Sequence, residues 1–230
     1  MKKIGIIGGI GPESTVDYYR RVIALYKQKI SKDDYPEIII NSINMTAMLQ
    51  MVADKNWDAL ISIMTEAIHS LYKSGADFGF MASNTPHIVY EQIRKSSPIP
   101  IISIVEAARK EAGRLALKKT ALLGTLFTMQ SRYYQDEFNK SRIDVIVPNE
   151  KEQQYIHEKL FTEIENGLFL EETRDGLLSI IKRLIIDEQI DSVVLGCTEL
   201  PLILTKDEFG IPFINTTKVH VESIIEYMLQ

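Results

Sequence analysis

Cysteine is nearly absent from this chain of 230 residues, in which Cys197 is the single example. A lone cysteine excludes a disulfide within the chain, and the lack of disulfides is typical of proteins kept in a reducing compartment. We therefore expect a cytoplasmic protein. The histidines do not show the spacing to cysteine or carboxylates that metal ligands have, so no metal site is predicted. They are His69, His87, His157 and His220.

Clusters of positive charge and long apolar runs are also missing. The net charge is −5, and no cluster of Lys and Arg stands out, so nucleic acid is not an expected partner. No apolar run approaches the roughly 20 residues of a membrane-spanning helix, so no membrane partner is expected. Apolar residues make up 45% of the chain, which is ordinary for a globular protein with a sizeable core.

Three well-known sequence motifs are missing or incomplete. No Gly-Lys-Ser/Thr follows the glycine-rich residues 8–12, and Ser14 stands where a dinucleotide-binding fingerprint has its third glycine. Asn41 and Ser42 end the next predicted strand, where a ribose would require a carboxylate. Nucleotide binding is disfavoured, and the segment is predicted to be a tight turn or a loop whose amides hold a substrate carboxylate. The absence of Gly-x-Ser-x-Gly argues against a serine hydrolase.

Apolar runs and helical patterns alternate along the chain. Short apolar runs predict strands at residues 2–7, 37–43, 78–82, 101–102, 120–123, 143–147, 193–195 and 212–214. Apolar residues at helical spacing predict helices at residues 13–30, 57–71, 86–94, 105–117, 129–139, 150–166, 171–186 and 218–229. Strands that alternate with helices indicate an α/β protein with parallel sheets.

The same pattern occurs twice. Matching segments follow in order at residues 2–8 and 118–124, 18–19 and 133–134, 77–83 and 191–197, and 99–102 and 211–214. Their nearly constant offset indicates one α/β unit used twice. We predict two domains, the first formed by residues 1–98 and 209–230 and the second by residues 99–208.

Ser83 and Cys197 stand at matching points of this repeat. Each follows a predicted buried strand, and open α/β sheets bind ligands at the carboxyl ends of their strands. A helix amino terminus just beyond Cys197 would lower the pKa of the thiol and favour the thiolate, although lone cysteines are often buried core residues. His87 is either a partner for a cysteine nucleophile or a residue that orients its own loop.

Four segments together resemble the aspartate/glutamate racemases, which are amino-acid racemases independent of pyridoxal phosphate. They are IGIIGGIGPEST at residues 4–15, SNTPH at 83–87, ALLGT at 121–125 and GCTE at 196–199. The resemblance covers essentially the whole chain. It implies two similar three-layer α/β domains with parallel sheets, related by a pseudo-twofold axis, with the active site in the cleft between them. We further expect a homodimer that acts on a small amino acid without a cofactor.

The resemblance also implies how the residues divide the work. One group removes the α-proton of the substrate, and a second reprotonates the α-carbon from the opposite face. By position these are Cys197, the main acid–base group, and Ser83, where such enzymes most familiarly have cysteine. A serine hydroxyl is a far weaker acid than a thiol. Substrate binding is implied for Ile10, Asn84, Thr85, Thr125 and Thr198.

Aspartate, glutamate or both are the expected substrates. The side-chain carboxylate of the substrate would be bound near residues 47–52, a stretch that offers only Gln50, with Thr46 just before it. Serine at position 83 also fits an impaired or engineered site. Two other functions stay open: another carbanion enzyme on this fold, such as an isomerase, decarboxylase or lyase, and a non-catalytic relative that binds an amino acid.

Overall fold

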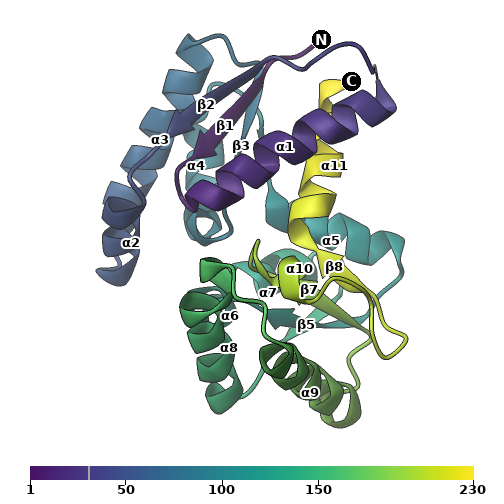
Figure 1. The fold of residues 1–230 in the computed structure, drawn as a ribbon. Coiled ribbons are helices and arrows are strands. Elements are labelled where there is room, and N and C mark those ends of the chain that lie inside the picture. The colour runs from purple at the N-terminus through teal and green to yellow at the C-terminus, as the bar shows by residue number, and fades with distance from the viewer. Residues whose placement is uncertain (31) are drawn as a thin grey trace. The chain divides into compact units, whose positions relative to one another are not determined.

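The computed structural model describes residues 1–30 and 32–230. The chain divides into two compact units: unit 1 comprises residues 1–104 and 220–230, and unit 2 comprises residues 105–219. Each unit holds one four-stranded sheet in which all pairs are parallel (Figure 1). The predicted fold class, two α/β domains with parallel sheets, is confirmed. Across the described residues, every helix is too short or too polar to cross a membrane.

Unit 1 has the sheet order β2-β1-β3-β4. Its elements are β1 (Ile4–Gly8), α1 (Pro12–Lys29), β2 (Ile38–Ser42), α2 (Met45–Ala53), α3 (Trp57–Lys73), β3 (Phe78–Met81), the 3-10 helix η1 (Thr85–Val89), α4 (Tyr90–Ser96) and β4 (Ile101–Ile102). The last helix, α11 (Thr216–Met228), contributes its residues from His220 onward to this unit.

Unit 2 has the sheet order β6-β5-β7-β8, which repeats the order of unit 1 strand by strand. Its elements are α5 (Ile104–Arg114), β5 (Lys119–Leu123), α6 (Leu126–Gln130), α7 (Tyr133–Asn139), β6 (Asp144–Ile146), α8 (Glu150–Thr162), η2 (Ile164–Asn166), α9 (Glu171–Glu188), β7 (Ser192–Leu195), α10 (Leu200–Ile203) and β8 (Phe213–Asn215).

Helices cover both faces of the sheet in unit 1. On one face, Ile4 and Ile6 of β1 pack with buried residues of α1 and α11. On the other face, Ile7 of β1 and Met81 of β3 pack with α2, α3 and α4. The division follows from strand geometry, because successive side chains point to opposite faces. Burial of these apolar side chains is the main force that holds the three layers together.

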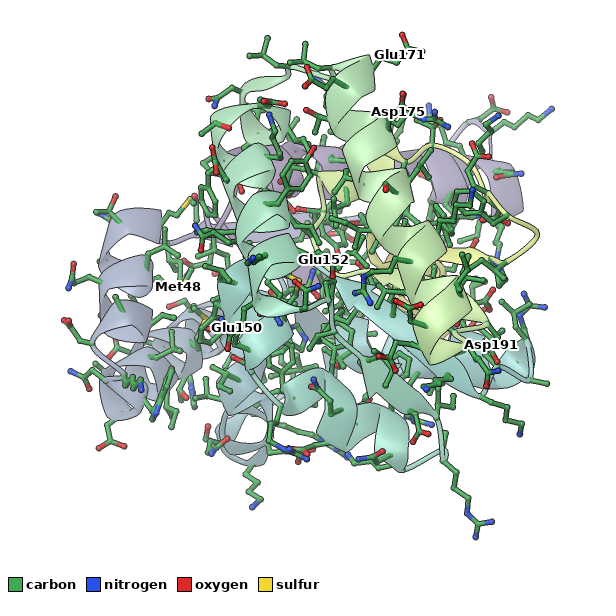
Figure 2. All side chains as sticks on the ribbon, turned by 90° about the horizontal axis from the view of Figure 1, so that it is seen from below. Met48, Glu150, Glu152, Glu171, Asp175 and Asp191 are labelled. Carbon is green, nitrogen blue, oxygen red and sulfur yellow. The ribbon has the colours of Figure 1, made fainter. Side chains whose placement is uncertain are left out.

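In unit 2, α8 and α9 lie side by side, and Glu152 links them (Figure 2). Its carboxylate accepts hydrogen bonds from Nε and Nη2 of Arg183 on α9. Glu152 also accepts the backbone N–H of Asn149, while the Asn149 side chain accepts the backbone N–H of Glu152. This reciprocal pair is a capping box. One carboxylate therefore both starts α8 and ties it to α9.

An aspartate before the third strand of each sheet makes the same bond. Asp77 Oδ2 accepts the backbone N–H of Lys3 at 2.6 Å, and Asp191 Oδ2 accepts that of Lys118 at 2.6 Å. Both bonds join the start of the third strand to the start of the first. The repeat seen in the sequence thus extends to individual side-chain contacts.

The fourth strand of each sheet lies in a different unit from the one that the sequence suggested. β4 pairs with β3 in unit 1 and β8 pairs with β7 in unit 2, whereas boundaries at residues 98/99 and 208/209 exchange them. The reason is backbone pairing that crosses the predicted boundaries. The carbonyl of Pro100 accepts the N–H of Gly79 at 2.9 Å, and that of Pro212 accepts the N–H of Val193 at 3.0 Å.

Some helices differ from the prediction. The sequence did not reveal α2, because all of its nine residues except Gln50 are apolar or Thr. No polar face therefore marks the helical period. Asn44 begins it by accepting the N–H of Ala47 at 3.0 Å. The predicted helix at 129–139 is divided into α6 and α7, and the one at 150–166 into α8 and η2.

Two histidines are buried in unit 1 without charge. His220 Nε2 lies 3.0 Å from the carbonyl of Ile102 and must donate to it, so Nδ1 accepts the Tyr18 hydroxyl at 2.8 Å. His87 Nδ1 likewise donates to the carbonyl of Ser83 at 3.1 Å. Burial lowers the pKa of His87 to about 4 and that of His220 to about 3.

We predict that this burial makes the fold sensitive to mild acid. The unfolded chain binds protons on both histidines below about pH 6.5, whereas the folded chain does not until far lower pH, so stability falls as the pH falls through that window. Each histidine should cost about 1 kcal/mol at pH 5.5. Urea unfolding of wild type and His220→Asn at pH 7.5 and 5.5 measures this. Equal losses in both proteins would contradict the prediction.

Candidate functional site

Ser83 of unit 1 follows directly after the last backbone bond between β3 and β1. That bond runs from the N–H of Ala82 to the carbonyl of Ile7, at 3.0 Å. Ser83 is half-buried in the turn that leads into η1. Its side chain therefore lies at the carboxyl edge of the sheet, where the sequence predicted it.

Cys197 of unit 2 stands at the equivalent point. The last backbone bond between β7 and β5 runs from the N–H of Gly196 to the carbonyl of Leu123, at 2.7 Å. A Cβ at position 196 would lie 2.7 Å from Leu122 Cδ1 and 3.0 Å from the Leu123 oxygen, so glycine suits this close approach. The next residue, Cys197, is 8% exposed. The two candidate acid–base residues thus occupy matching backbone positions in the two sheets.

Three neighbours shape the loop around Ser83. His87 donates to the carbonyl of Ser83 and stacks on Tyr90, with ring centroids 5.5 Å apart. This contact favours the interpretation of His87 as a residue that orients its own loop. Asn84 is buried and Thr85 is half-buried. Their substrate-binding roles stay predictions.

Two hydroxyls in the first turn of α1 hold the glycine-rich loop that follows β1. Gly9 has a φ of +78°, and a Cβ there would lie 2.4 Å from the carbonyl oxygen of Ile43, so glycine is required. The Gly9 N–H donates to Thr15 Oγ1 at 2.9 Å and is therefore not available to a substrate. Ser14 Oγ donates to the carbonyl of Ala82 at 2.9 Å, which ties this loop to the end of β3.

Several predicted binding residues have structural partners already. Ile10 is buried in the apolar core, so any substrate contact there falls to its backbone. Thr125 starts α6 by accepting the N–H of Thr128 at 3.3 Å. Thr198 is half-buried, and its hydroxyl donates to the side chain of Glu199. In the stretch expected to bind a side-chain carboxylate, Gln50 donates to Asp54 at 3.0 Å.

Cys197 lies in a cluster of carboxyl groups. Its thiol donates to Glu199 Oε2 at 2.9 Å, and Thr198 Oγ1 donates to the same oxygen at 2.7 Å. A carboxyl oxygen of Glu165, from η2, completes the group: the polar atoms of Glu165, Cys197 and Glu199 lie within 4.8 Å of one another. Sequence reasoning missed both carboxylates. Glu199 could have been found from its position two residues after the cysteine, but nothing in the sequence links Glu165 to it.

The prediction that the Cys197 thiol is unusually acidic is wrong. Burial, the charge of Glu199 and the hydrogen bond to its side chain raise the pKa of the Cys197 thiol well above its usual range, and Glu165 raises it further. A backbone hydrogen bond at Glu199 acts in the opposite direction but is the smaller effect. The predicted helix start lies just beyond Cys197, but α10 is only the short helix Leu200–Ile203, and its effect is smaller than that of burial and Glu199. A carboxylate, not a helix end, therefore faces the sulfur.

Glu165 and Tyr133 are the other titratable groups that act with Cys197. Burial of the Glu165 carboxyl and the negative charge of Glu199 raise its pKa to about 7, although the residue as a whole remains exposed. Burial also raises the pKa of Tyr133, whose hydroxyl donates to Thr128 Oγ1 at 3.3 Å. Near neutral pH the thiol and the phenol hold their protons, and Glu165 is close to half-protonated.

These observations define a two-unit α/β protein with a cysteine at the end of one central strand and a hydroxyl at the matching end of the other. The family model for Asp/Glu/hydantoin racemases matches residues 7–224. The chain belongs to this family, whose members are isomerases, and the prediction of a racemase-family enzyme is confirmed.

Individual relatives agree with the family. The chain is 29% identical over 230 residues to the broad specificity amino-acid racemase RacX of Bacillus subtilis, covering 98% of each chain. It is 33% identical to PH1733, an aspartate racemase homologue of Pyrococcus horikoshii, with a TM-score of 0.88 over 100% of both chains. Glutamate racemase of Francisella tularensis shares the fold, with a TM-score of 0.70 and 15% identity over 99% of this chain and 81% of that one.

We predict that the Cys197 thiol titrates above the ordinary value of about 8.5. Protein labelled with ¹³C at cysteine Cβ should give one resonance, because the chain has a single cysteine. That resonance should keep its thiol position through pH 8.5 in the folded protein and titrate near the ordinary value in urea. A folded-state midpoint at or below the urea value would show that the carboxylates do not control the thiol.

Proposed function

We propose that this protein is a cofactor-independent amino-acid racemase that acts on aspartate, glutamate or both. Cys197 is the main acid–base group and Ser83 takes the second acid–base position. Asn84, Thr85, Thr125, Thr198 and the backbone at Ile10 bind the substrate carboxylate and amino group. The lone cysteine supports a cytoplasmic location, and we include a homodimer in the proposal.

The observation that carries this proposal is the matching position of Ser83 and Cys197, each one residue beyond the last backbone bond to the first strand of its sheet. Membership of the racemase family and the similarity to a broad specificity amino-acid racemase support the reaction type. The relatives include a glutamate racemase and a homologue of aspartate racemase, and this supports acidic substrates.

The chemistry requires a base, an acid and a way to hold negative charge. The Cα–H bond breaks, its proton forms an S–H bond with the Cys197 thiolate, and the electron pair spreads into the substrate carboxylate. Hydrogen bonds to that carboxylate in a site with little water stabilise the charge. A proton from Ser83, or from a water that it holds, then reaches the opposite face of the α-carbon. The second step is the weaker one, because a serine hydroxyl is a poor acid and a poor base.

Incubation with a panel of amino acids in deuterated water tests the function. Proton NMR reports exchange of the α-proton, and chiral chromatography reports racemisation. A racemase exchanges and inverts its substrate, another carbanion enzyme yields a different product, and a non-catalytic binder does neither. The last two results would overturn the proposal.

Cys197→Ala should reduce α-proton exchange at least 10²-fold, because it removes the group assigned to take the α-proton. Circular dichroism and the urea midpoint should show an intact fold, since the substitution only removes a sulfur at the edge of the core. Exchange at the wild-type rate would refute the assignment of Cys197.

Ser83→Cys should speed racemisation by supplying a stronger acid–base group. In the wild type, the enantiomer whose α-proton faces Cys197 should exchange deuterium faster than it racemises, and its mirror image should exchange slowly. The substitution should bring the two exchange rates closer together. Equal rates for both enantiomers in the wild type would mean that Ser83, or a water it holds, is already a full partner.

A further inference from the structure

Three hydroxyl side chains of unit 2 form a chain of hydrogen bonds near Cys197. The hydroxyl of Tyr133, at the start of α7, donates to Thr128 Oγ1 at 3.3 Å, and Thr128 Oγ1 lies 3.1 Å from Thr125 Oγ1. Burial is the main cause of the raised pKa of Tyr133, but charge on Cys197 also raises it, so the phenol lies within electrostatic range of the sulfur. Thr125 follows the end of β5, which pairs with β7, and therefore lies at the same edge of the sheet as Cys197.

Packing fixes the direction of the middle hydroxyl. Thr128 is 1% exposed, and its methyl group fills the space beside two glycines. A Cβ at position 124 would lie 3.1 Å from Thr128 Cγ2, and one at position 196 would lie 3.3 Å from it. A β-branched side chain has few choices of χ1, and this contact selects one of them. The ends of β5 and β7 therefore hold the Thr128 hydroxyl toward Thr125 and Tyr133.

The hydrogens of this chain have a favoured order. Because Tyr133 donates to Thr128 Oγ1, the hydrogen of Thr128 can go to the next oxygen, that of Thr125. Thr125 Oγ1 already accepts the backbone N–H of Thr128 at 3.3 Å, so its lone pairs face Thr128. With Thr128 as the donor of the pair, the hydrogen of Thr125 has no acceptor among the described residues. Thr125 is half-buried, so this hydrogen is within reach of a ligand.

We propose that Tyr133 is a positioning residue that, through Thr128, makes the Thr125 hydroxyl a donor to the α-carboxylate of the substrate. Bonds along a chain of hydroxyls polarise one another, so the last hydroxyl is the strongest donor. The carboxylate gains negative charge as the α-proton leaves, and a donor already in place stabilises the transition state more than the bound substrate. The inference rests on the proposed function for its substrate, whereas the order of the hydrogens is a property of the free protein.

The rate of α-proton exchange of L-aspartate and L-glutamate in deuterated water tests the role of Tyr133. Tyr133→Phe removes only the hydroxyl and should lower kcat about fivefold with little change in KM, because the lost interaction strengthens in the transition state. Wild-type kcat in this variant would overturn the proposal. Tyr72→Phe removes a hydroxyl from a tyrosine of α3 that is 52% exposed, so it is the matched control and should behave as wild type.

Substitutions at Thr128 separate its hydroxyl from its methyl group. Thr128→Val keeps a methyl group beside the two glycines but breaks the chain, so kcat should fall at least about tenfold. Thr128→Ser keeps the hydroxyl and should stay within about threefold of the wild type. Urea midpoints check that both variants are folded. A greater loss in Thr128→Ser than in Thr128→Val would mean that packing, and not the hydroxyl chain, is what the reaction needs.

A double variant shows whether Tyr133 acts through Thr125. In protein that carries Thr125→Val the final donor is gone, so the addition of Tyr133→Phe should change kcat less than about twofold. A tyrosine that only supports the fold would lower kcat by the same factor in both backgrounds, and that result would overturn the proposal.

Neutron diffraction from crystals of the free wild-type protein in deuterated water decides the order of the hydrogens without any activity. Deuterium on Thr128 Oγ1 should point to Thr125 Oγ1, and deuterium on Thr125 Oγ1 should point away from Thr128. Deuterium on Thr125 that points to Thr128 would overturn the proposal. Failure of the wild type to exchange either amino acid would instead refute the proposed function for acidic substrates, and the neutron map would still decide the order of the chain.

Discussion

The short backbone bond between Gly196 and Leu123 is the constraint on which the site in unit 2 depends. It holds β7 so close to β5 that a Cβ at position 196 would lie 3.0 Å from the carbonyl oxygen of Leu123, and the chain then turns away with Cys197 as its first residue. The bond from Ala82 to Ile7 likewise ends the pairing of β3 with β1 in unit 1, although position 82 holds the Cβ of an alanine. In a parallel sheet the strand ends share one edge, so equal register in the two sheets produces equal positions for the residues that follow.

Once Cys197 is held there, burial and charge decide its chemistry. The thiol lies beside Glu199 and Glu165, and in such surroundings the neutral form is favoured. A protonated thiol can donate a proton to the substrate. To remove a proton from the substrate, the thiol must first lose its own hydrogen to an acceptor. The Glu199 carboxylate that accepts the thiol hydrogen is therefore one of the groups that hold the resting state as a thiol.

Local sequence patterns were sufficient to predict most helices and strands and to show that Ser83 and Cys197 stand at matching positions of the repeat. Buried parallel strands are short apolar runs with abrupt polar ends, and the repeat aligned their ends without any structure. The failures have physical causes. α2 lacks a polar face, and η2 follows α8 after a break that propensity does not reveal. The fourth strands were predicted as strands, but the sheet to which each belongs depends on pairing in space and not on order along the chain.

By itself, the sequence determined the fold class, the twofold repeat, the family and the position of the cysteine, because each of these depends on neighbours in the chain or on patterns with a fixed period. Only the tertiary structure decided the state of the thiol. Glu165 is far from Cys197 along the chain, and the direction of the Glu199 carboxylate depends on how η2, α10 and the end of β7 pack. A pKa is set by burial and by charges in space, and neither can be read from order along the chain.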